Sequence, residues 1–248
     1  MMNNFYQEDL AYIHHRGFGR FAKLVGEQLL ALLHDHGIDS GLVTDIGCGS
    51  GIWAELLLDS GYDVCGIDIS PAMIELARAN APGGQFRQAS AFDCDLPRSQ
   101  VITALGEVLG YAAEGMPRDE QLLDLFRRAA DHLVPGGLLI FDVIVVSGGA
   151  SMDYRDWQAG EDWAVLIQCS EQQQPGQLKR NMTIFRQQGD QYRRTEEEHL
   201  VRVFNPEELL RMLTVAGFDA EETDHYGTYP LASRRLAFVA RKQRDAGD

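Results

Sequence analysis

The chain has 248 residues, and 37 acidic against 22 basic side chains give it a formal net charge of −15 at pH 7. So strong a negative charge repels the phosphates of nucleic acids and the headgroups of anionic membranes, which argues against both as partners and favours a small-molecule substrate. The length fits one domain that spans residues 1–248 and carries an insertion.

The cysteines and the first residues indicate a cytoplasmic protein without a metal site. The four cysteines are Cys48, Cys65, Cys94 and Cys169. They form no C-x-x-C pair and have no histidine at the spacing of metal ligands, so we expect reduced, buried thiols and no metal. The first residues lack the basic and then apolar pattern of a signal peptide, and no apolar run approaches the length of a membrane span.

A helical cap is predicted over residues 1–40. Apolar residues follow a helical period over residues 18–33. Before this helix, His14 and His15 follow a stretch that contains aromatic residues. Two interpretations of this stretch remain open, namely a helical lid that folds over a bound ligand and an ordinary amphipathic helix.

The most informative segment is VTDIGCGSG at residues 43–51, where an apolar run ends in Asp45 just before three glycines. A chain that leaves a strand and turns at once into a helix needs positive φ angles, and bare backbone where a ligand approaches. Gly47, Gly49 and Gly51 supply both. Their G-x-G-x-G spacing differs from the G-x-G-x-x-G of dinucleotide-binding turns.

Asp45 distinguishes further between candidate ligands. A carboxylate at the end of the first strand repels a pyrophosphate and attracts an ammonium group, so we expect the ligand to carry a positive charge there. The alternative is that Asp45 caps the glycine turn through backbone amides.

A second acidic residue ends the next predicted strand, in YDVCGIDIS at residues 62–70. Asp68 lies there at the separation from the glycine turn at which a carboxylate accepts hydrogen bonds from ribose hydroxyls. Ser70 and Pro71 then begin a helix as its N-cap and its first residue. Met73 is expected either against an adenine face or in the core.

Three motifs follow one another along the chain: VTDIGCGSG, VCGIDIS, and HLVPGGLLIFD at residues 132–142. Together they make the chain resemble the class I S-adenosylmethionine-dependent methyltransferases of the small-molecule type. The resemblance implies an α/β, Rossmann-like fold in which helices flank a seven-stranded, mostly parallel sheet. It also implies S-adenosylmethionine as the cofactor and S-adenosylhomocysteine as the product.

By this resemblance, the glycine turn wraps the methionine part of the cofactor, Asp45 lies near its amino group, and Asp68 binds both ribose hydroxyls. The full set of expected cofactor-binding residues is Asp45, Gly47, Cys48, Gly49, Asp68, Ile69, Met73, Ser90, Ala91, Leu105 and Gly106. The contact with the adenine amine is left open between Ser90 and Asp93.

Strand and helix signals alternate over residues 41–149 and resume over residues 205–248, which predicts a parallel sheet with crossover helices. The predicted elements after the second strand are helices at 71–80, 119–133 and 206–216 and strands at 85–89, 100–104, 138–145, 218–225 and 236–241. By resemblance, one of the last two strands is antiparallel.

Residues 150–204 have a different character, because they are rich in Gln, Glu, Tyr and Arg. Candidate strands at 163–170, 178–187 and 192–204 are separated by Pro-Gly and Gly-Asp turns, which predicts an antiparallel β insertion. It leaves the sheet at the C-terminal end of a strand, where ligands bind in α/β sheets. We therefore expect it to form a lid over the substrate.

Two candidate catalytic residues, Glu107 and Tyr111, follow the strand at 100–104. Both are expected to face the transferred methyl group, and the alternative for Glu107 is a solvated loop acid.

Two more candidates, Glu197 and His199, lie in the insertion. Strand alternation places them on one face with Val201 and Val203, so we expect this face to point inward. An exposed edge strand is the alternative interpretation.

These residues suit methyl transfer to a small molecule. Glu107 and Glu197 can bind the ammonium form of an amine, and His199 is the candidate base for a hydroxyl. We predict a methyltransferase, with N-methylation slightly favoured over O-methylation. The rival interpretations are a non-catalytic S-adenosylmethionine sensor and an NAD-dependent oxidoreductase. The oligomeric state is open, and a homodimer is one option.

Overall fold

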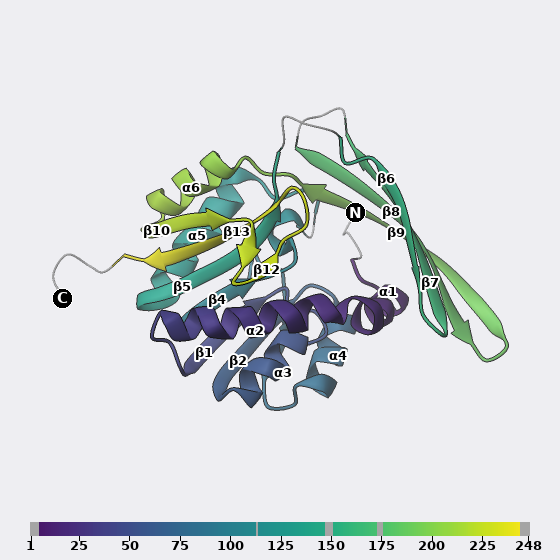
Figure 1. The fold of residues 1–248 in the computed structure, drawn as a ribbon, viewed down its shortest axis with the longest axis horizontal. Coiled ribbons are helices and arrows are strands. Elements are labelled where there is room, and N and C mark those ends of the chain that lie inside the picture. Colours follow the sequence, from purple (N-terminus) through teal and green to yellow (C-terminus); the bar gives the residue numbers. More distant parts are fainter. Residues whose placement is uncertain (1–4, 113, 147–150, 173–175, 244–248) are drawn as a thin grey trace.

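The structure is a computed structural model and describes residues 5–112, 114–146, 151–172 and 176–243. A seven-stranded sheet with helices on both faces carries a separate four-stranded sheet that extends away from it (Figure 1). None of the helices within these described ranges is both long and apolar enough to cross a membrane.

The large sheet has the topology predicted from the sequence. Its strands are β1 (Gly41–Ile46), β2 (Tyr62–Asp68), β3 (Gln85–Gln88), β4 (Ser99–Ala104), β5 (Leu133–Ile144), β10 (Phe218–Thr223) and β13 (Arg235–Lys242). They lie side by side in the order β10-β13-β5-β4-β1-β2-β3. β13 is antiparallel to both of its neighbours, and the other pairs are parallel. The Rossmann-like sheet with one antiparallel strand is therefore confirmed.

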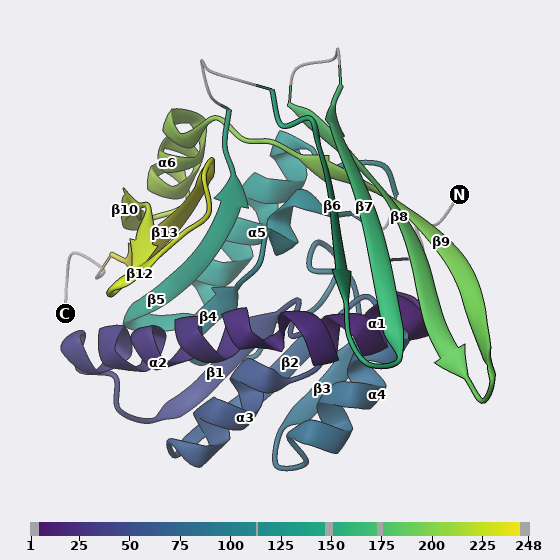
Figure 2. The same cartoon turned by 45° about the vertical axis from the view of Figure 1, so that its right-hand side comes forward.

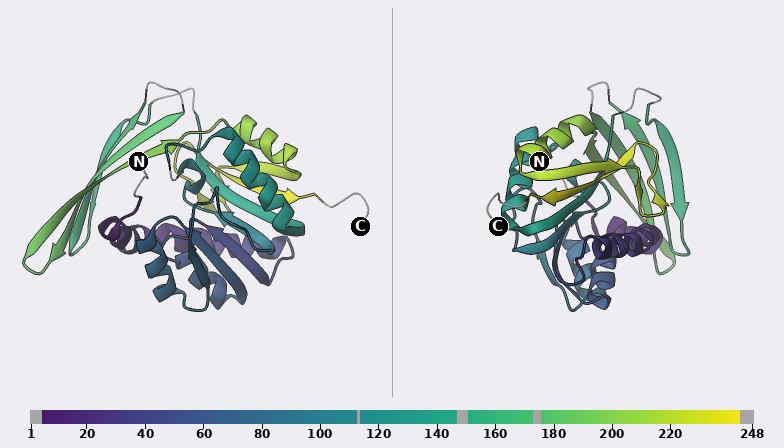
Figure 3. Two further views of the ribbon diagram at one scale, coloured as in Figure 1. Left: turned by 180° about the vertical axis from the view of Figure 1, so that it is seen from behind. Right: turned by 60° about the vertical axis from the view of Figure 1, so that its left-hand side comes forward.

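Helices cover both faces of this sheet. They are α1 (Glu8–Ile13), the π-helix η1 (His14–Phe18), α2 (Gly19–Asp35), α3 (Ile52–Asp59), α4 (Pro71–Asn80), the 3-10 helix η2 (Val108–Gly110), α5 (Asp119–His132) and α6 (Pro206–Val215). α2, α3 and α4 pack on one face, and α5 and α6 pack on the other (Figure 3).

Each face of the sheet has its own apolar core, because the central strands are buried on both sides. On the α5 side, the ring of Phe141 stacks between those of Phe126 and Phe238, at centroid distances of 5.6 and 5.0 Å. On the α2 side, Leu29 and Leu57 are fully buried against the strands. The two cores hold the C-terminal strand ends in fixed positions, and the functional residues follow these ends.

The insertion folds as a four-stranded antiparallel sheet, which we call the insertion sheet. Its strands are β6 (Tyr154–Ala159), β7 (Trp163–Glu171), β8 (Gln177–Gln188) and β9 (Gln191–Arg202), in that order across the sheet. The three predicted strands and the Gly-Asp turn at 189–190 are present, whereas β6 was not predicted. Pro175 of the predicted Pro-Gly turn lies outside the described residues.

The insertion sheet joins the core through a narrow stem. The chain leaves the core after β5 and returns to it beside the same point, because Val145 and Phe204 form an isolated parallel bridge. The amide of Phe204 donates to the carbonyl oxygen of Ile144, and that of Val146 donates to the carbonyl oxygen of Phe204, both at 2.8 Å. Figure 2 shows the sheet extending from the end of β5 toward the lower right and passing over α1.

The N-terminal helices lie between the insertion sheet and the glycine turn. A Cβ atom on Gly17 would stand 2.6 Å from the indole of Trp163 in β7, and one on Gly19 would stand 2.5 Å from the side chain of Ile52 in α3. The rigid indole leaves no room for a side chain at Gly17, whereas the terminal methyl of Ile52 can move aside at Gly19. η1 thus packs against the insertion sheet and the start of α2 packs against α3, an arrangement that is compatible with the helical-lid interpretation.

A short hairpin of β11 (His225–Tyr226) and β12 (Tyr229–Pro230) connects β10 to β13. The sequence did not predict this hairpin. It brings the buried side chain of Tyr226 against the end of β5, beside the cavity described next.

Candidate active site

A cavity of about 710 Å³ lies beyond the C-terminal ends of β1, β2 and β4. The N-terminal helices and the inner face of the insertion sheet enclose its other sides. All the residues expected to bind the cofactor border it: Asp45, Gly47, Cys48, Gly49, Asp68, Ile69, Met73, Ser90, Ala91, Leu105 and Gly106. Of the four candidate catalytic residues, Glu107, Tyr111 and His199 border it and Glu197 does not.

The glycine turn adopts the backbone conformation that its sequence predicts. Gly47, Gly49 and Gly51 have φ angles of +68°, +52° and +79°. A Cβ atom on Gly47 would stand 2.3 Å from Val108, and one on Gly51 would stand 2.9 Å from the backbone of Ala77. A Cβ atom on Gly49 would instead enter open space. The first and third glycines thus allow close packing, and the middle one presents bare backbone to the cavity.

Asp68 links the glycine turn to helix α4. Its carboxylate accepts hydrogen bonds from the amide of Gly49 at 2.9 Å and from the amide of Ser70 at 2.8 Å. Burial raises the pKa of the Asp68 carboxyl, and these amides oppose the rise. Ser70 caps the helix, because its Oγ accepts from the amide of Met73 at 3.2 Å. Met73 is buried and also borders the cavity, a position that is compatible with both interpretations of this side chain.

Asp45 is buried at the end of β1, where its Oδ1 accepts a hydrogen bond from Thr103 Oγ1 at 2.7 Å. Burial raises the pKa of Asp45 to about 7, and the hydrogen bond from Thr103 opposes this rise. The amides of Gly47 and Cys48 donate to the carbonyl oxygen of Ile67, so Asp45 does not cap the turn through them. Its position beside the cavity fits the alternative role, next to a ligand cation.

Of the two candidates for the adenine contact, the structure places one beside the cavity. Ser90 borders the cavity, whereas Asp93 is exposed and does not border it. Ser90 Oγ also accepts a hydrogen bond from the amide of Phe92 at 3.2 Å, which fixes the turn after β3.

Glu107 lies in a strained loop after β4, with a φ angle of +67°. The preceding Gly106 has a φ angle of +85°. The amides of both residues donate to the carboxylate of Asp142 at the end of β5, at 2.8 Å from Gly106 and 3.1 Å from Glu107. Burial raises the pKa of Asp142 to about 7. Asp142 therefore holds a backbone conformation that a non-glycine residue rarely adopts.

The expectation that Glu107 presents a free carboxylate to the substrate needs correction. Arg180 Nη1 from β8 lies 2.9 Å from its Oε2, and Arg235 from β13 forms an ion pair with its Oε1. Neither arginine was predicted. Two guanidinium groups thus neutralise the negative charge that was expected to bind an ammonium group.

The environment of Arg180 is rich in tyrosine. Its Nη1 donates to the hydroxyl of Tyr111 at 3.0 Å. The side chains of Tyr6 and Tyr154 also interact electrostatically with the Arg180 guanidinium and favour its charged form. Burial raises the pKa of the Tyr111 hydroxyl. A sequence signal for Arg180 exists, because strand alternation places it on the face of β8 that carries the buried Leu178. A cation on an apolar, inward strand face is unusual.

His199 and Glu197 share the buried face of β9, as predicted. His199 Nε2 lies 2.9 Å from Glu197 Oε2. The Glu197 carboxylate also accepts from the amides of Tyr6 at 2.9 Å and Gln7 at 2.8 Å. Glu197 thus holds His199 and the start of α1, and its carboxylate is turned away from the expected ammonium site. The ring of His199 packs edge-on against that of Phe5, at a centroid distance of 5.0 Å.

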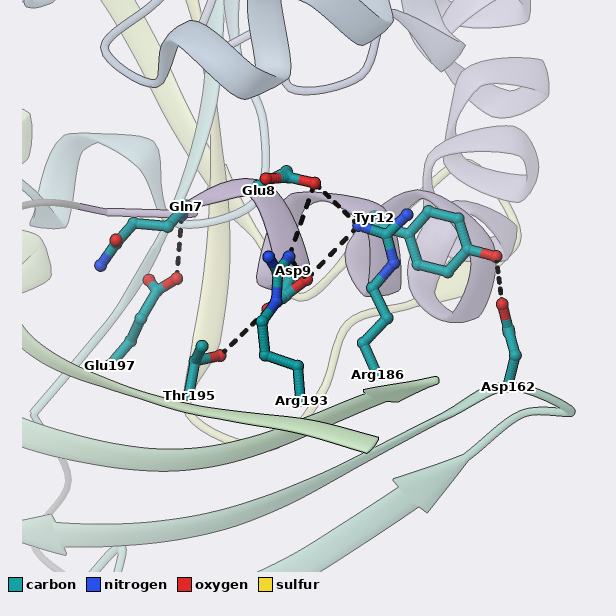
Figure 4. A network of polar contacts seen from close by, with 9 residues as sticks. All are labelled: Gln7, Glu8, Asp9, Tyr12, Asp162, Arg186, Arg193, Thr195 and Glu197. Carbon is teal, nitrogen blue, oxygen red and sulfur yellow. Dashed lines mark hydrogen bonds and ion pairs between the residues drawn. The ribbon is translucent and has the colours of Figure 1, made fainter. Parts of the chain in front are cut away.

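A second set of contacts joins α1 to the insertion sheet (Figure 4). We call this set the clasp; it consists of Glu8, Asp9 and Tyr12 of α1 with Asp162, Arg186, Arg193 and Thr195 of the insertion. Asp9 is 4% exposed and pairs with Arg193 and, at 3.4 Å, with Arg186. The hydroxyl of Tyr12 donates to Asp162 at 2.7 Å, and the guanidinium of Arg186 lies 3.9 Å from the centre of the Tyr12 ring.

Besides Glu107 Oε2, two buried polar atoms of residues that border the cavity have no hydrogen-bond partner within the described chain: His14 Nδ1 and Trp53 Nε1. Burial lowers the pKa of His14 to about 4, so its imidazole is neutral at physiological pH. Buried polar atoms are nearly always satisfied, so these two atoms indicate where a ligand makes hydrogen bonds. No pattern in the sequence distinguishes His14 from its neighbour His15.

The fold and the site define the class of protein. A Rossmann-like sheet, a G-x-G-x-G turn between two acidic strand ends, and an insertion over the cavity are the arrangement of the class I methyltransferases. A family model described as "Methyltransferase domain" matches residues 12–223. The chain belongs to this family of S-adenosylmethionine-dependent methyltransferases.

Individual relatives agree with this assignment. A protein of Geobacillus sp. (strain WCH70) with a provisional methyltransferase name is 28% identical over 221 residues, which cover 81% of this chain and 84% of that protein. A dTDP-3-amino-3,6-dideoxy-alpha-D-glucopyranose N,N-dimethyltransferase of Streptomyces fradiae is 24% identical over 211 residues, which cover 84% and 81%. A S-adenosylmethionine-dependent methyltransferase from Clostridium acetobutylicum ATCC 824 shares the fold, with a TM-score of 0.79, 16% identity, and coverage of 94% and 97%.

Proposed function

We propose that this enzyme transfers a methyl group from S-adenosylmethionine to a nitrogen atom of a small-molecule acceptor. One observation carries the proposal. A single cavity is bordered on one side by the glycine turn with Asp45 and Asp68, and on the other side by Tyr111, Arg180 and His199. A cofactor and an acceptor can therefore meet in one enclosed space.

The residues on the glycine-turn side fit the cofactor. Gly49 and Gly106 leave open space where a Cβ atom would stand, so backbone can approach a ligand closely at both. Asp68 keeps lone pairs for ribose hydroxyls, and Asp45 suits an ammonium group. When bound, S-adenosylmethionine supplies a methyl group that its positive sulfur already activates. The protein then has to position the acceptor and exclude water.

On the acceptor side, His199 is the proposed proton acceptor. The Glu197 carboxylate only accepts hydrogen bonds, so in a neutral His199 ring Nε2 carries the hydrogen and Nδ1 accepts a proton. Two amides of the N-terminal segment fix Glu197, and Glu197 in turn fixes the ring. Tyr111 is proposed to contact the acceptor, and Glu107 to hold Arg180 in place.

The charges on the acceptor side are compatible with a nitrogen nucleophile. An amine attacks only in its neutral form, and nearby cations lower the pKa of an ammonium group. Arg180 and Arg235 border the acceptor side, so they favour the nucleophilic form of an amine there. The Streptomyces fradiae relative, which by its name dimethylates an amino sugar, supports the same choice.

Two measurements test the proposal. Isothermal titration calorimetry with S-adenosylhomocysteine should show saturable binding, and a folded protein that binds neither it nor S-adenosylmethionine would contradict the proposal. Incubation with methyl-labelled S-adenosylmethionine and a metabolite pool should then label an amine. The His199→Ala variant serves as the control. Cofactor binding without any methyl transfer would identify the protein as a sensor instead.

A further inference from the structure

Arg180 presents a fixed cation to the acceptor side of the cavity. Its neighbours on the inner face of β8, Leu178, Met182 and Ile184, are all buried and apolar. The side chain of Arg180 is itself only 16% exposed. Arginine is seldom buried without a full set of partners, so its position on this face needs an explanation.

Arg235 lies on the opposite side of the same carboxylate. Its side chain is 17% exposed, and its ion pair with Glu107 faces the one formed by Arg180. Among the described residues that border the cavity, Arg180 and Arg235 are the only lysine or arginine side chains. Asp142, which lies 3.4 Å from Arg235 Nε, is fully buried and does not border the cavity. Two cations, Arg180 and Arg235, and the paired anion Glu107 therefore meet at this end of the cavity, and the exposed Asp156 of β6 is a second carboxylate on the insertion side.

The contact between Arg180 and Glu107 is incomplete. Although Glu107 Oε2 lies 2.9 Å from Arg180 Nη1, this buried oxygen forms no hydrogen bond of good geometry within the described chain. The contacts of Arg180 with Glu107 and Tyr111 both use Nη1. A guanidinium group has five N–H donors in a planar fork, so donors remain for an anion that approaches from the tyrosine side.

We propose that the acceptor carries an anionic group, a phosphate or a carboxylate, which binds to Arg180 and Arg235. This inference rests on the proposed function, since it assigns the substrate class of the same site. The net charge of −15 repels such an acceptor elsewhere on the protein, so a local excess of positive charge is needed to bind it. Tyr6 and Tyr111, which also border the cavity, can add hydroxyl donors to the same group.

The test compares charged probes with neutral probes of similar shape. Calorimetry is done on the full chain saturated with S-adenosylhomocysteine, first with dTDP against thymidine and then with benzoate against benzamide. We expect one anion to bind at least about tenfold more tightly than its neutral counterpart. A preference for dTDP identifies a phosphate site, and a preference for benzoate identifies a carboxylate site. If neither anion is preferred, the inference is wrong.

Substitutions test whether Arg180 is responsible for the preference for anionic probes. Arg180→Gln should abolish the preference. Lys179→Gln is the matched control, because Lys179 precedes Arg180 but points outward and pairs with the exposed Glu198. Should Arg180→Gln fail to bind S-adenosylhomocysteine, Arg180→Lys replaces it and should weaken the preference. A preference that is unchanged in the Arg180 variant would overturn the proposal.

The two proposals fail in different ways. If the wild-type protein does not bind S-adenosylhomocysteine, the proposed function is wrong. If it binds S-adenosylhomocysteine but does not distinguish charged from neutral probes, only the anionic acceptor is excluded.

Discussion

The two sides of the cavity are built by different means. On the core side, positions are set by parallel strand ends and by backbone, as in the amide of Gly49 that donates to Asp68. On the insertion side they are set by long side chains that reach across elements, as in the pairs Arg180–Glu107 and Arg193–Asp9. Backbone held by two apolar cores stays in place without a ligand. Contacts between separate elements can break and form again, so we infer that the core side is preformed and the insertion side closes over the acceptor.

The largest expected effect separates chemistry from cofactor binding. His199→Ala should lower kcat about 100-fold, because a positioned proton acceptor is lost. The affinity for S-adenosylhomocysteine should stay within about twofold, since no cofactor contact changes. Steady-state kinetics and calorimetry measure the two quantities.

The neighbouring Glu198→Gln variant is the control for His199→Ala. Glu198 lies on the exposed face of β9, so both quantities should match the wild type. A large loss of cofactor affinity in His199→Ala would show that the two sides of the cavity do not act independently.

Asp68→Ala should have the reverse effect. Loss of the carboxylate should weaken binding of S-adenosylhomocysteine by at least ~1.5 kcal/mol, if the carboxylate meets the ribose hydroxyls. Asp63→Ala, in an exposed position of the same strand, should bind normally. Circular dichroism melting checks that both variants are folded. Unchanged affinity in Asp68→Ala would place the ribose contact elsewhere.

The pH dependence of cofactor binding should report on Asp45. Its pKa in the free protein is about 7, and a bound ammonium group lowers it by favouring the ionised carboxylate. Protonation therefore opposes binding, so affinity should fall as the pH drops below 7, by up to about tenfold per pH unit. Calorimetry from pH 7.5 to pH 5.5 measures the slope.

Asp45→Asn cannot ionise at this position and should bind more weakly, with a flatter pH profile. Asp142 has a raised pKa as well, but it is present in both proteins. Any difference between the pH profiles of the wild type and Asp45→Asn is therefore due to the titration of Asp45. Parallel profiles would exclude Asp45 as the group that meets the cofactor's ammonium.

The smallest expected effect concerns the clasp. Asp9→Asn removes the charge that Arg186 and Arg193 share, so α1 should separate from the insertion sheet more often. We expect faster amide hydrogen exchange in α1 and a few-fold higher KM for the acceptor, with little change in cofactor affinity. Glu8→Gln, which alters a largely exposed partner in the same clasp, should have less effect. Equal exchange rates in Asp9→Asn and wild type would contradict a closing movement.

The sequence predicted the parts of the structure that depend on local patterns better than those that depend on contacts between distant residues. The glycine turn and Asp68 were predictable because few residue types tolerate that backbone, and because the spacing is local. β6 was missed since it is an exposed edge strand without apolar alternation, and it depends on pairing with β7. Its formation is a property of the folded sheet rather than of its own residues.

The surroundings of Glu107 show the same limit. The residue itself was found from its place after β4, but its partners Arg180 and Arg235 come from distant strands. Such long-range pairs leave no local pattern. Arg180 was detectable as a cation on an apolar strand face, whereas no such pattern indicated Arg235 or the link from Asp142 to the loop amides.

The stem of the insertion has a consequence for how this enzyme can diversify. Val145 and Phe204 stand side by side in the bridge that closes the stem, so the chain leaves the core and returns to it at almost one point. The segment between them could therefore be exchanged as one unit without moving the core strands. Replacing it with another hairpin assembly would alter which acceptors are accepted and would leave the strand ends that hold the methyl donor unaltered.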